Sequence, residues 1–248
     1  MLKVIALGDI HGRWAAVWRA LKAVAAADAM CEPTQPVIDG RFHVVFIGDL
    51  VHYKDADSYA AAVGEPFDIH NPLHLQRAAK VQIRELYRFK NYLDKANGNA
   101  TVILGNHDEE ALTHSYELGT RSGLAHHEFD PAKGGLALPD ALELWMQSFP
   151  REKIIHGVHF AHAGPLPGMQ FFDDFFYHDH DSKTWWLKKP SYVQQAGHRF
   201  GVYGHTPMEE GIYVDSQHCF AMIDALAQQQ FLEMILSPER LDYRILKF

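Results

Sequence analysis

The sequence predicts a single-domain α/β protein built on two β-sheets. Three observations lead to this prediction. Residues 1–105 alternate between strand-like and helix-like segments, an order typical of parallel strands with helices packed on the sheet. The second half instead carries short strand-like runs in quick succession, which favours antiparallel pairing and a second sheet. A chain of 248 residues fits one large domain and leaves little room for two.

The elements of the first half follow from their hydrophobic patterns. Short apolar runs that stop at a glycine or a Gly-Asp pair are typical of buried strands, and they occur at residues 2–7, 42–47 and 101–104. Apolar side chains recur at helical spacing in residues 14–27 and 73–93. The polar segment 53–71 contains Gly64 and Pro66, and we expect it to form a long loop or lid inserted into the domain.

The second half begins with a helical pattern at residues 140–149. Short apolar runs then predict strands at residues 154–155, 158–161, 200–203, 212–214, 220–223 and 231–236. Their closeness in the sequence predicts hairpins.

Composition excludes several classes of protein. Hydrophobic residues make up 47% and charged residues 22%, which rules out a disordered or fibrous chain. There is no apolar run long enough to span a membrane, and the N-terminus lacks the features of a secretory leader, so we expect a cytoplasmic protein. The net charge of −8 disfavours binding to nucleic acid. Two cysteines are too few for a disulfide framework, whereas 17 histidines are unusually many.

Side chains that can bind a metal follow each strand predicted in the first half. Asp9 and His11 follow the first strand, Asp49 follows the second, and Asn106 follows the third. Because loops at the carboxyl ends of parallel strands meet at one crevice, these residues are expected to converge.

The second half adds His162 and His205, each at the end of an apolar run. Carboxylates, an amide oxygen and imidazoles together suit Mn²⁺, Fe, Zn²⁺ or Co²⁺. No cysteine belongs to this set, which disfavours a structural zinc site. Six ligands are too many for one catalytic metal that keeps open positions, so the set predicts two metals bridged by one carboxylate.

Five motifs occur in order along the chain: GDIHG at 8–12, GDLV at 48–51, GNHD at 105–108, HAG at 162–164 and GHT at 204–206. Together they resemble the calcineurin-like metallophosphoesterase superfamily, and most closely its branch of serine/threonine protein phosphatases and bacterial diadenosine tetraphosphatases. The resemblance implies a two-sheet sandwich flanked by helices, with a dinuclear metal site at the carboxyl ends of the strands. Residues 220–236 are similar to the hairpin that closes this fold.

The resemblance also implies how two divalent metals are held, with Mn²⁺ expected and Fe, Zn²⁺ or Co²⁺ as alternatives. Asp49 bridges both metals, Asp9 and His11 complete the first site, and the second site is completed by Asn106, His162 and His205.

The same resemblance makes His107 the general acid that protonates the leaving group. The nucleophile is a hydroxide that bridges the metals. The implied substrates are phosphomonoesters or nucleotide phosphoanhydrides, carried by a small molecule or a phosphoprotein.

The chain departs from this branch directly after the GDLV motif. The related phosphatases continue with Asp-Arg-Gly, whereas this chain has His52, Tyr53 and Lys54. The arginine that clamps phosphate and the aspartate that orients the acid histidine are therefore both missing. A second departure is Pro207 after GHT, where many diesterase relatives have another histidine.

Other residues are candidates for these missing roles. Lys54, Arg13 or Arg199 could supply positive charge to the phosphate. The partner of the acid histidine could be Asp55, Asp57 or Asp108, although Asp108 is also expected to cap the helix that follows it.

Two other functions remain open at this point. A phosphodiesterase or nuclease is disfavoured by the acidic surface and by Pro207. A non-catalytic scaffold with this fold is disfavoured by the intact Gly-Asn-His motif.

Substrate specificity is expected to reside in residues 53–71 and in the aromatic stretch 171–186. The latter begins with a pattern typical of a packed amphipathic helix, formed by Phe171, Phe172, Phe175 and Phe176. The histidine-rich segments 126–127 and 178–181 are expected to be solvated loops, not a third metal site.

Overall fold

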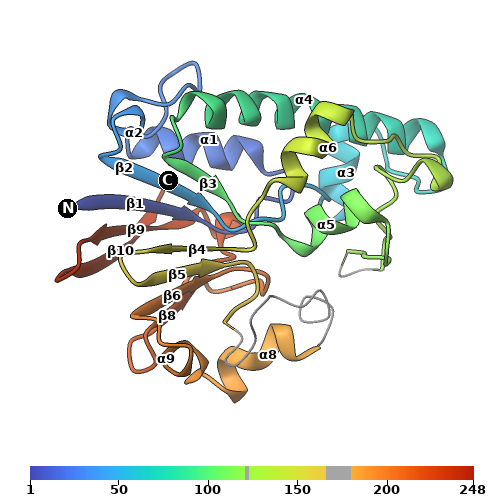
Figure 1. Ribbon diagram of the computed structural model, residues 1–248. Helices are drawn as coiled ribbons and strands as arrows, with labels where there is room; N and C mark the ends of the chain where they lie inside the picture. Colours follow the sequence, from blue (N-terminus) through green and yellow to red (C-terminus); the bar gives the residue numbers. More distant parts are fainter. Residues whose placement is uncertain (121–122, 166–179) are drawn as a thin grey trace.

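Two five-stranded sheets lie face to face, with helices on their outer faces (Figure 1). The computed structural model describes residues 1–120, 123–165 and 180–248. Within these ranges no helix combines the length and the apolar character needed to cross a membrane. The expected segment with Phe171, Phe172, Phe175 and Phe176 lies outside the described residues.

The first sheet has the order β10-β9-β1-β2-β3. Its central strands β1 (Leu2–Leu7), β2 (Phe42–Phe46) and β3 (Ala100–Val102) are parallel, as predicted. Strand β9 (Gln230–Leu236) pairs antiparallel with β1, and β10 (Leu241–Lys247) pairs antiparallel with β9 at the edge. Strand β10 was not predicted, because most of its residues are exposed and its sequence lacks an apolar run.

The second sheet has the order β4-β5-β6-β8-β7. Its strands are β4 (Glu152–Ile155), β5 (Val158–Ala161), β6 (Phe200–Tyr203), β7 (Tyr213–Asp215) and β8 (Phe220–Met222). The expected antiparallel pairing is found for β4 with β5 and for β7 with β8, but β5, β6 and β8 are parallel neighbours. The closing hairpin is also not residues 220–236, because β8 and β9 belong to different sheets and β9 turns back into β10.

The central strands are buried on both faces, which explains their continuous apolar sequences. Successive side chains of a strand point to opposite faces. Ile5 and Phe46 therefore belong to the core under the helices, whereas Val4 and Val45 belong to the core between the two sheets.

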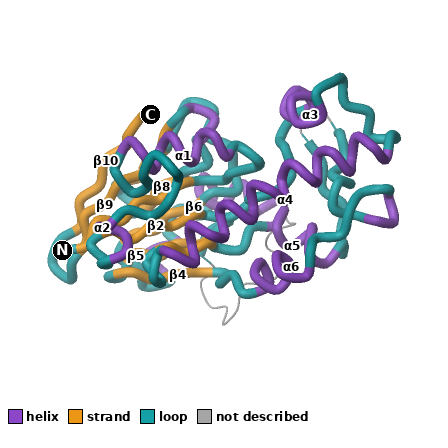
Figure 2. Tube along the Cα trace, turned by 90° about the horizontal axis from the view of Figure 1, so that it is seen from above, coloured by secondary structure: helices purple, strands orange, loops and turns teal. Residues whose placement is uncertain are grey.

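Helices α1 (Trp14–Ala23) and α4 (Pro72–Lys95) cover the first sheet, and Figure 2 shows both lying over its strands. Three further helices gather beyond the end of this sheet at which β1 and β2 finish: α3 (Ala56–Val63), α5 (Asn106–Thr113) and α6 (Asp140–Gln147). The remaining short helix of the first half is α2 (Gln35–Ile38). On the outer face of the second sheet lie α8 (His180–Lys188) and α9 (Tyr192–Gln195) (Figure 1).

Helix α1 ends earlier than the predicted boundary at residue 27. Ala25 takes a left-handed conformation (φ 55°) directly after the C-cap residue Val24. The amide of Ala25 bonds to the carbonyl of Lys22 and the amide of Ala26 to that of Leu21, which is a Schellman motif. The alanine-rich sequence conceals this end, because glycine usually occupies the left-handed position.

Residues 53–71 are not the continuous loop expected from the sequence. They contain α3, whose N-cap Asp55 accepts a hydrogen bond from the Ser58 amide and whose C-cap is the left-handed Gly64. The helix is fixed by Tyr59, which is fully buried against the rest of the insertion and α4. The capping residues Asp55 and Gly64 were the sequence signals for this helix.

Candidate metal centre

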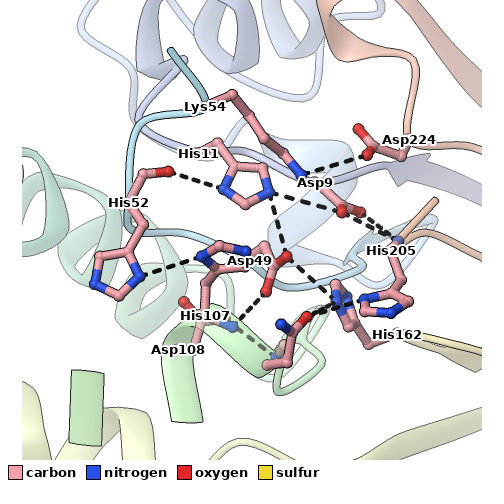
Figure 3. A network of polar contacts seen from close by, with 12 residues as sticks. Asp9, His11, Asp49, His52, Lys54, His107, Asp108, His162, His205 and Asp224 are labelled. Carbon is pink, nitrogen blue, oxygen red and sulfur yellow. Dashed lines mark hydrogen bonds and ion pairs between the residues drawn. The ribbon is translucent and has the colours of Figure 1, made fainter. Parts of the chain in front are cut away.

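The six residues predicted to bind metal converge at the carboxyl ends of five strands. Figure 3 labels Asp9, His11, Asp49, His162 and His205 in this arrangement. Asp9 and His11 follow β1, and Asp49 follows β2. Asn106 opens α5 just after β3, while β5 and β6 of the other sheet lead into His162 and His205. The two sheets thus present their ligands to one another across the same end of the sandwich.

Asp49 occupies the centre of this arrangement and is buried. Its Oδ2 atom lies 3.2 Å from Nε2 of His11 and 3.3 Å from Nε2 of His162. Its other oxygen, Oδ1, accepts a hydrogen bond of 2.9 Å from the backbone amide of His107. Asp49 therefore contacts both halves of the ligand set through a single carboxylate oxygen.

On one side of Asp49 lie Asp9 and His11. The carboxylate of Asp9 accepts hydrogen bonds from the His205 amide at 3.1 and 3.0 Å. Nδ1 of His11 lies 2.8 Å from the carbonyl oxygen of His52 and donates to it, which leaves the lone pair on Nε2. That Nε2 atom is buried, 3.8 Å from Oδ2 of Asp9, and has no hydrogen-bond partner among the described residues.

On the other side of Asp49, the amide oxygen of Asn106 joins two histidines. It lies 3.0 Å from Nε2 of His162 and 2.9 Å from Nδ1 of His205. Nδ1 of His162 donates to the carbonyl of Ile47 at 2.7 Å, so its Nε2 faces the ligand set. The Nε2 atom of His205 lies 2.9 Å from Oγ of Ser182 in α8.

Burial and mutual repulsion make this group of carboxylates electrostatically unfavourable without added positive charge. Burial, together with Asp224, raises the pKa of Asp9 well above its usual value. Burial by itself also raises the pKa of Asp49, but His162 and His107 outweigh it and hold that pKa well below its usual range. Although burial lowers the pKa of His162, Asp49 and Asp9 outweigh this effect and raise it to about 9.

The residues present fit two divalent cations. Among the described residues, three buried groups have ligand atoms within 4.8 Å of one another, and two of them lie at these ligands: His11 with Asp49 and His107, and Asp9 with Asp49 and His162. Both groups contain Asp49. A bound cation would accept the lone pair of Nε2 of His11 and would offset the repulsion between the carboxylates of Asp9, Asp49 and Asp224.

His107 lies beside these ligands but has a different partner. Its Nδ1 atom lies 3.2 Å from Nδ1 of His52. The three aspartates considered as its partner are engaged elsewhere or exposed: Asp55 caps α3, Asp57 is exposed on α3, and Asp108 accepts hydrogen bonds from the amides of Leu50 and Gly105. The role of Asp108 at the start of α5 agrees with its expected capping function.

The candidate phosphate-binding cations are placed differently. Lys54 lies beside the site, with Nζ 3.9 Å from Oδ2 of Asp224 (Figure 3). Arg13 lies 3.9 Å from Asp55 at the start of α3. Arg199 is not at the site: it precedes β6 at the end opposite His205 and donates to the carbonyls of Ser237 and Pro238.

Sequence reasoning missed several residues around the site. Asp224 follows β8 as Asp49 follows β2, so the same signal could have found it. Lys183 in α8 has no such signal. Burial and Lys54 lower the pKa of Lys183, while Asp49 and Asp9 act in the opposite direction, which shows that this lysine is part of the electrostatic environment of the site.

A sequence profile of the calcineurin-like phosphoesterase family matches residues 2–237, so the chain belongs to this family. The class of reaction is therefore metal-dependent hydrolysis of phosphoesters. A search of curated proteins finds no match.

Solved structures share the fold at low sequence identity. One is a protein provisionally described as a diadenosine tetraphosphatase, with 19% identity, a TM-score of 0.56, and coverage of 98% of this chain and 93% of the other. A cold-active protein-tyrosine phosphatase from a psychrophilic Shewanella species has 17% identity, a TM-score of 0.59, and coverage of 100% and 81%. A serine/threonine phosphatase from Saccharomyces cerevisiae has 11% identity, a TM-score of 0.55, and coverage of 100% and 80%.

Proposed function

We propose that this protein hydrolyses phosphomonoesters or nucleotide-type phosphoanhydrides with two divalent cations, Mn²⁺ first among them. The observation that carries the proposal is the position of Asp49, whose Oδ2 contacts both His11 and His162. One carboxylate shared between two ligand groups is the arrangement that dinuclear hydrolases use for in-line displacement at phosphorus.

Each side chain has a defined part in this proposal. The first cation is held by Asp9, His11 and Asp49, and the second by Asp49 with Asn106, His162 and His205. When bound, the cations neutralise phosphate charge and lower the pKa of the attacking water.

His107 supplies the proton for the leaving group. Its Nδ1 atom is occupied by His52, so Nε2 is the atom that carries the transferred proton. As the P–O bond breaks, its electron pair goes to the leaving oxygen, which takes this proton. His107 then regains a proton from solvent.

Lys54 is the phosphate ligand that the geometry favours over Arg13 and Arg199. It is held beside the carboxylates by Asp224, whereas Arg13 is paired with Asp55 on α3. A lysine offers a point charge and lacks the bidentate geometry of an arginine. Lys54→Ala should therefore raise KM for a phosphomonoester more than Arg13→Ala does.

Two rival functions are less well supported. A nuclease is disfavoured because a net charge of −8 repels a nucleic-acid backbone. A non-catalytic scaffold is disfavoured because six potential metal ligands converge in a buried position, and Nε2 of His11 among them has no hydrogen-bond partner among the described residues.

The test combines metal analysis with a substrate comparison. Protein stripped with a chelator and reloaded with Mn²⁺ is assayed for metal content and for kcat/KM on nitrophenyl phosphate, bis(nitrophenyl) phosphate and a dinucleoside polyphosphate. We expect two metals per chain and a clear preference for monoester or anhydride over diester. His205→Ala should lower metal content, and His218→Ala, which changes a histidine of the β7–β8 turn, should not.

Failure to bind any metal, together with no activity on reloading with Mn²⁺, Fe, Zn²⁺ or Co²⁺, would contradict the catalytic proposal and support the scaffold. A preference for the diester would support the phosphodiesterase.

A further inference from the structure

Three buried side chains form a row that leads away from the metal ligands. Nδ1 of His107 lies 3.2 Å from Nδ1 of His52, and Nε2 of His52 lies 3.3 Å from Oε2 of Glu110. His52 is completely buried, and Glu110 is 5% exposed. Glu110 is one turn along α5 from His107, so the helix that positions the acid histidine also carries this carboxylate.

The ring of His52 is held from the other side as well. It stacks on His126, with ring centroids 4.6 Å apart and planes 6° from parallel. His126 is therefore buried and not part of the solvated loop that the sequence predicted. Nδ1 of His126 contacts the Tyr59 hydroxyl at 2.7 Å, and that hydroxyl donates to Glu128. Gln82 completes the support, because its side chain accepts from the His52 amide at 2.9 Å and donates to Glu128 at 2.9 Å.

A third metal is the obvious alternative for this cluster, since ligand nitrogens of His52, His107 and His126 lie within 4.8 Å of one another. The ring geometry excludes it. An imidazole binds a cation along a lone pair that lies in the plane of the ring. The planes of His52 and His126 are nearly parallel and separated by stacking, so no cation can lie in both planes.

We propose that Glu110 acts on His107 through His52, as a positioning chain for the acid histidine. This inference rests on the proposed function, in which His107 donates a proton to the leaving group. Oε2 of Glu110 faces Nε2 of His52 at 3.3 Å, outside hydrogen-bond geometry in this structure, and favours the tautomer of His52 with its proton on Nε2. That tautomer leaves the Nδ1 lone pair of His52 to accept from Nδ1–H of His107. His107 is thereby held in one orientation by its Nδ1 proton. When it acts as the acid it carries a second proton on Nε2, which passes to the leaving oxygen, and no proton moves along the chain.

The arrangement has a chemical consequence. A neutral imidazole contacts His107, and the carboxyl of Glu110 lies one ring further away, where burial and Glu128 raise its pKa to about 8 and leave it mostly uncharged at neutral pH. Because Coulomb attraction weakens with distance, the chain stabilises a protonated His107 less than a directly bound carboxylate does. Orientation is therefore its main contribution.

The test uses two phosphate substrates and three variants. An alkyl phosphate needs a proton on its leaving oxygen, whereas nitrophenyl phosphate does not. We expect His52→Ala to lower kcat/KM for the alkyl phosphate by about 10–100-fold and Glu110→Gln by about tenfold, with little change for nitrophenyl phosphate and with metal content unchanged. In the double variant, Glu110→Gln should add nothing to His52→Ala, because Glu110 acts only through His52.

Glu109→Gln is the matched control. Glu109 is adjacent to Glu110 on α5 and equally buried, but it pairs with Arg151. It should leave the ratio of the two kcat/KM values unchanged. Equal losses on both substrates in Glu110→Gln, or an additive double variant, would overturn the positioning chain while leaving the proposed function intact.

A readout independent of turnover is the tautomer of His52. In ¹⁵N-histidine-labelled protein loaded with diamagnetic Zn²⁺, we expect NMR to show His52 protonated on Nε2 and His107 protonated on Nδ1. A proton on Nδ1 of His52 would overturn the inference. If the wild type hydrolyses neither substrate, the proposed function fails, and this measurement still decides whether the chain of contacts exists.

Discussion

Four residues of the site have a left-handed backbone although none is glycine: His11 (φ 44°), Asp49 (φ 49°), His52 (φ 65°) and His205 (φ 63°). Such conformations cost about 1–3 kcal/mol each and persist only where surrounding contacts hold them. The carbonyl of Asp49 accepts from the amides of Ile10 and His11, which ties the two ligand loops together. The site therefore stores strain in its backbone, and this orients the ligand side chains before any cation arrives.

The first residue-scale prediction concerns Asp49. We expect Asp49→Asn to reduce activity more than any other change of a single ligand, because it removes the charge between two cations that then repel each other. Metal analysis should show fewer than two cations per chain. If Asp9→Asn or His205→Ala is equally damaging while two metals remain bound, Asp49 does not bridge them.

The second concerns His107. His107→Asn should lower hydrolysis of an alkyl phosphate by about 10²–10⁴-fold while largely sparing nitrophenyl phosphate. Since His52 stands where the related phosphatases have an orienting carboxylate, a loss near the lower end of this range is expected. Equal losses on both substrates would mean that His107 positions phosphate or supports Asn106.

At the residue scale, the sequence predicted where a side chain lies when a motif specified both the residue type and its position directly after a strand. Asp9, Asp49 and His162 were placed in this way. The positions of Glu110 and Lys183 near the site could not be predicted in this way, because each lies on a helix whose approach to the site depends on packing between distant segments.

At the scale of elements, the boundaries depend on contacts that local sequence does not contain. Helix α1 was predicted too long because Ala25, a strong helix former, adopts the left-handed C′ position. Helix α3 was taken for a loop because its burial depends on Tyr59 meeting α4. Strand order in the second sheet was mistaken because closeness in sequence indicated hairpins, whereas β5, β6 and β8 pair in parallel.

The left-handed alanine gives an element-scale prediction. Ala25 is exposed, so Ala25→Gly relieves strain without opening a cavity, and we expect the free energy of unfolding to rise by about 0.5–1 kcal/mol. Ala23→Gly, inside the last turn of the same helix, should lower it by about 0.5–1 kcal/mol. Chemical denaturation of both variants measures the difference, and a loss of stability in Ala25→Gly would contradict the Schellman assignment.

Strand β2 supplies a prediction about pH. His43 is buried with Nε2 3.0 Å from Oγ1 of Thr101 on β3, and burial, assisted by Lys153, lowers its pKa to about 4. His43 therefore binds a proton near pH 6.5 in the unfolded chain but only near pH 4 in the folded chain. The free energy of unfolding consequently falls as the pH decreases between these values.

The comparison with His43→Gln isolates this effect, because glutamine does not titrate. Between pH 7 and pH 5 the wild type should lose about 2 kcal/mol relative to His43→Gln. The control is His70→Gln, which changes an exposed histidine outside β2 and should not reproduce the effect of His43→Gln.

At the scale of the whole molecule, the predicted class of fold and the convergence of the strand ends agree with the structure. The alternation of strand and helix in the first half fixed the parallel core, because each helix must return the chain to the same sheet edge. The assignment of β9 and β10 to the first sheet could not be foreseen, because the chain must return from the second sheet so that β9 pairs with β1 and β10 pairs with β9.

Removal of the cations should destabilise the entire fold. A ligand at one hundred times its Kd stabilises the folded state by about 2.7 kcal/mol, which for a chain of this size corresponds to about 5–10 °C in Tm per cation. We expect a chelator to lower Tm by this amount and Mn²⁺ to restore it. The chelator should lower the Tm of Asp49→Asn much less than that of the wild type. If both proteins lose the same amount, the cations bind at a site that does not include Asp49.

The separation of Asp9 and His205 along the chain limits when the site can form during synthesis. The amide of His205 bonds to Asp9 across 196 residues of chain, which a ribosome takes roughly 10–40 s to add. Throughout that interval β1 has β2 on one side and an unpaired edge on the other, and the ligands of the second sheet do not yet exist. A nascent chain can therefore present Asp9, His11 and Asp49 but not the second half of the ligand set. The ligand set proposed for the second cation is therefore complete only after translation has passed His205.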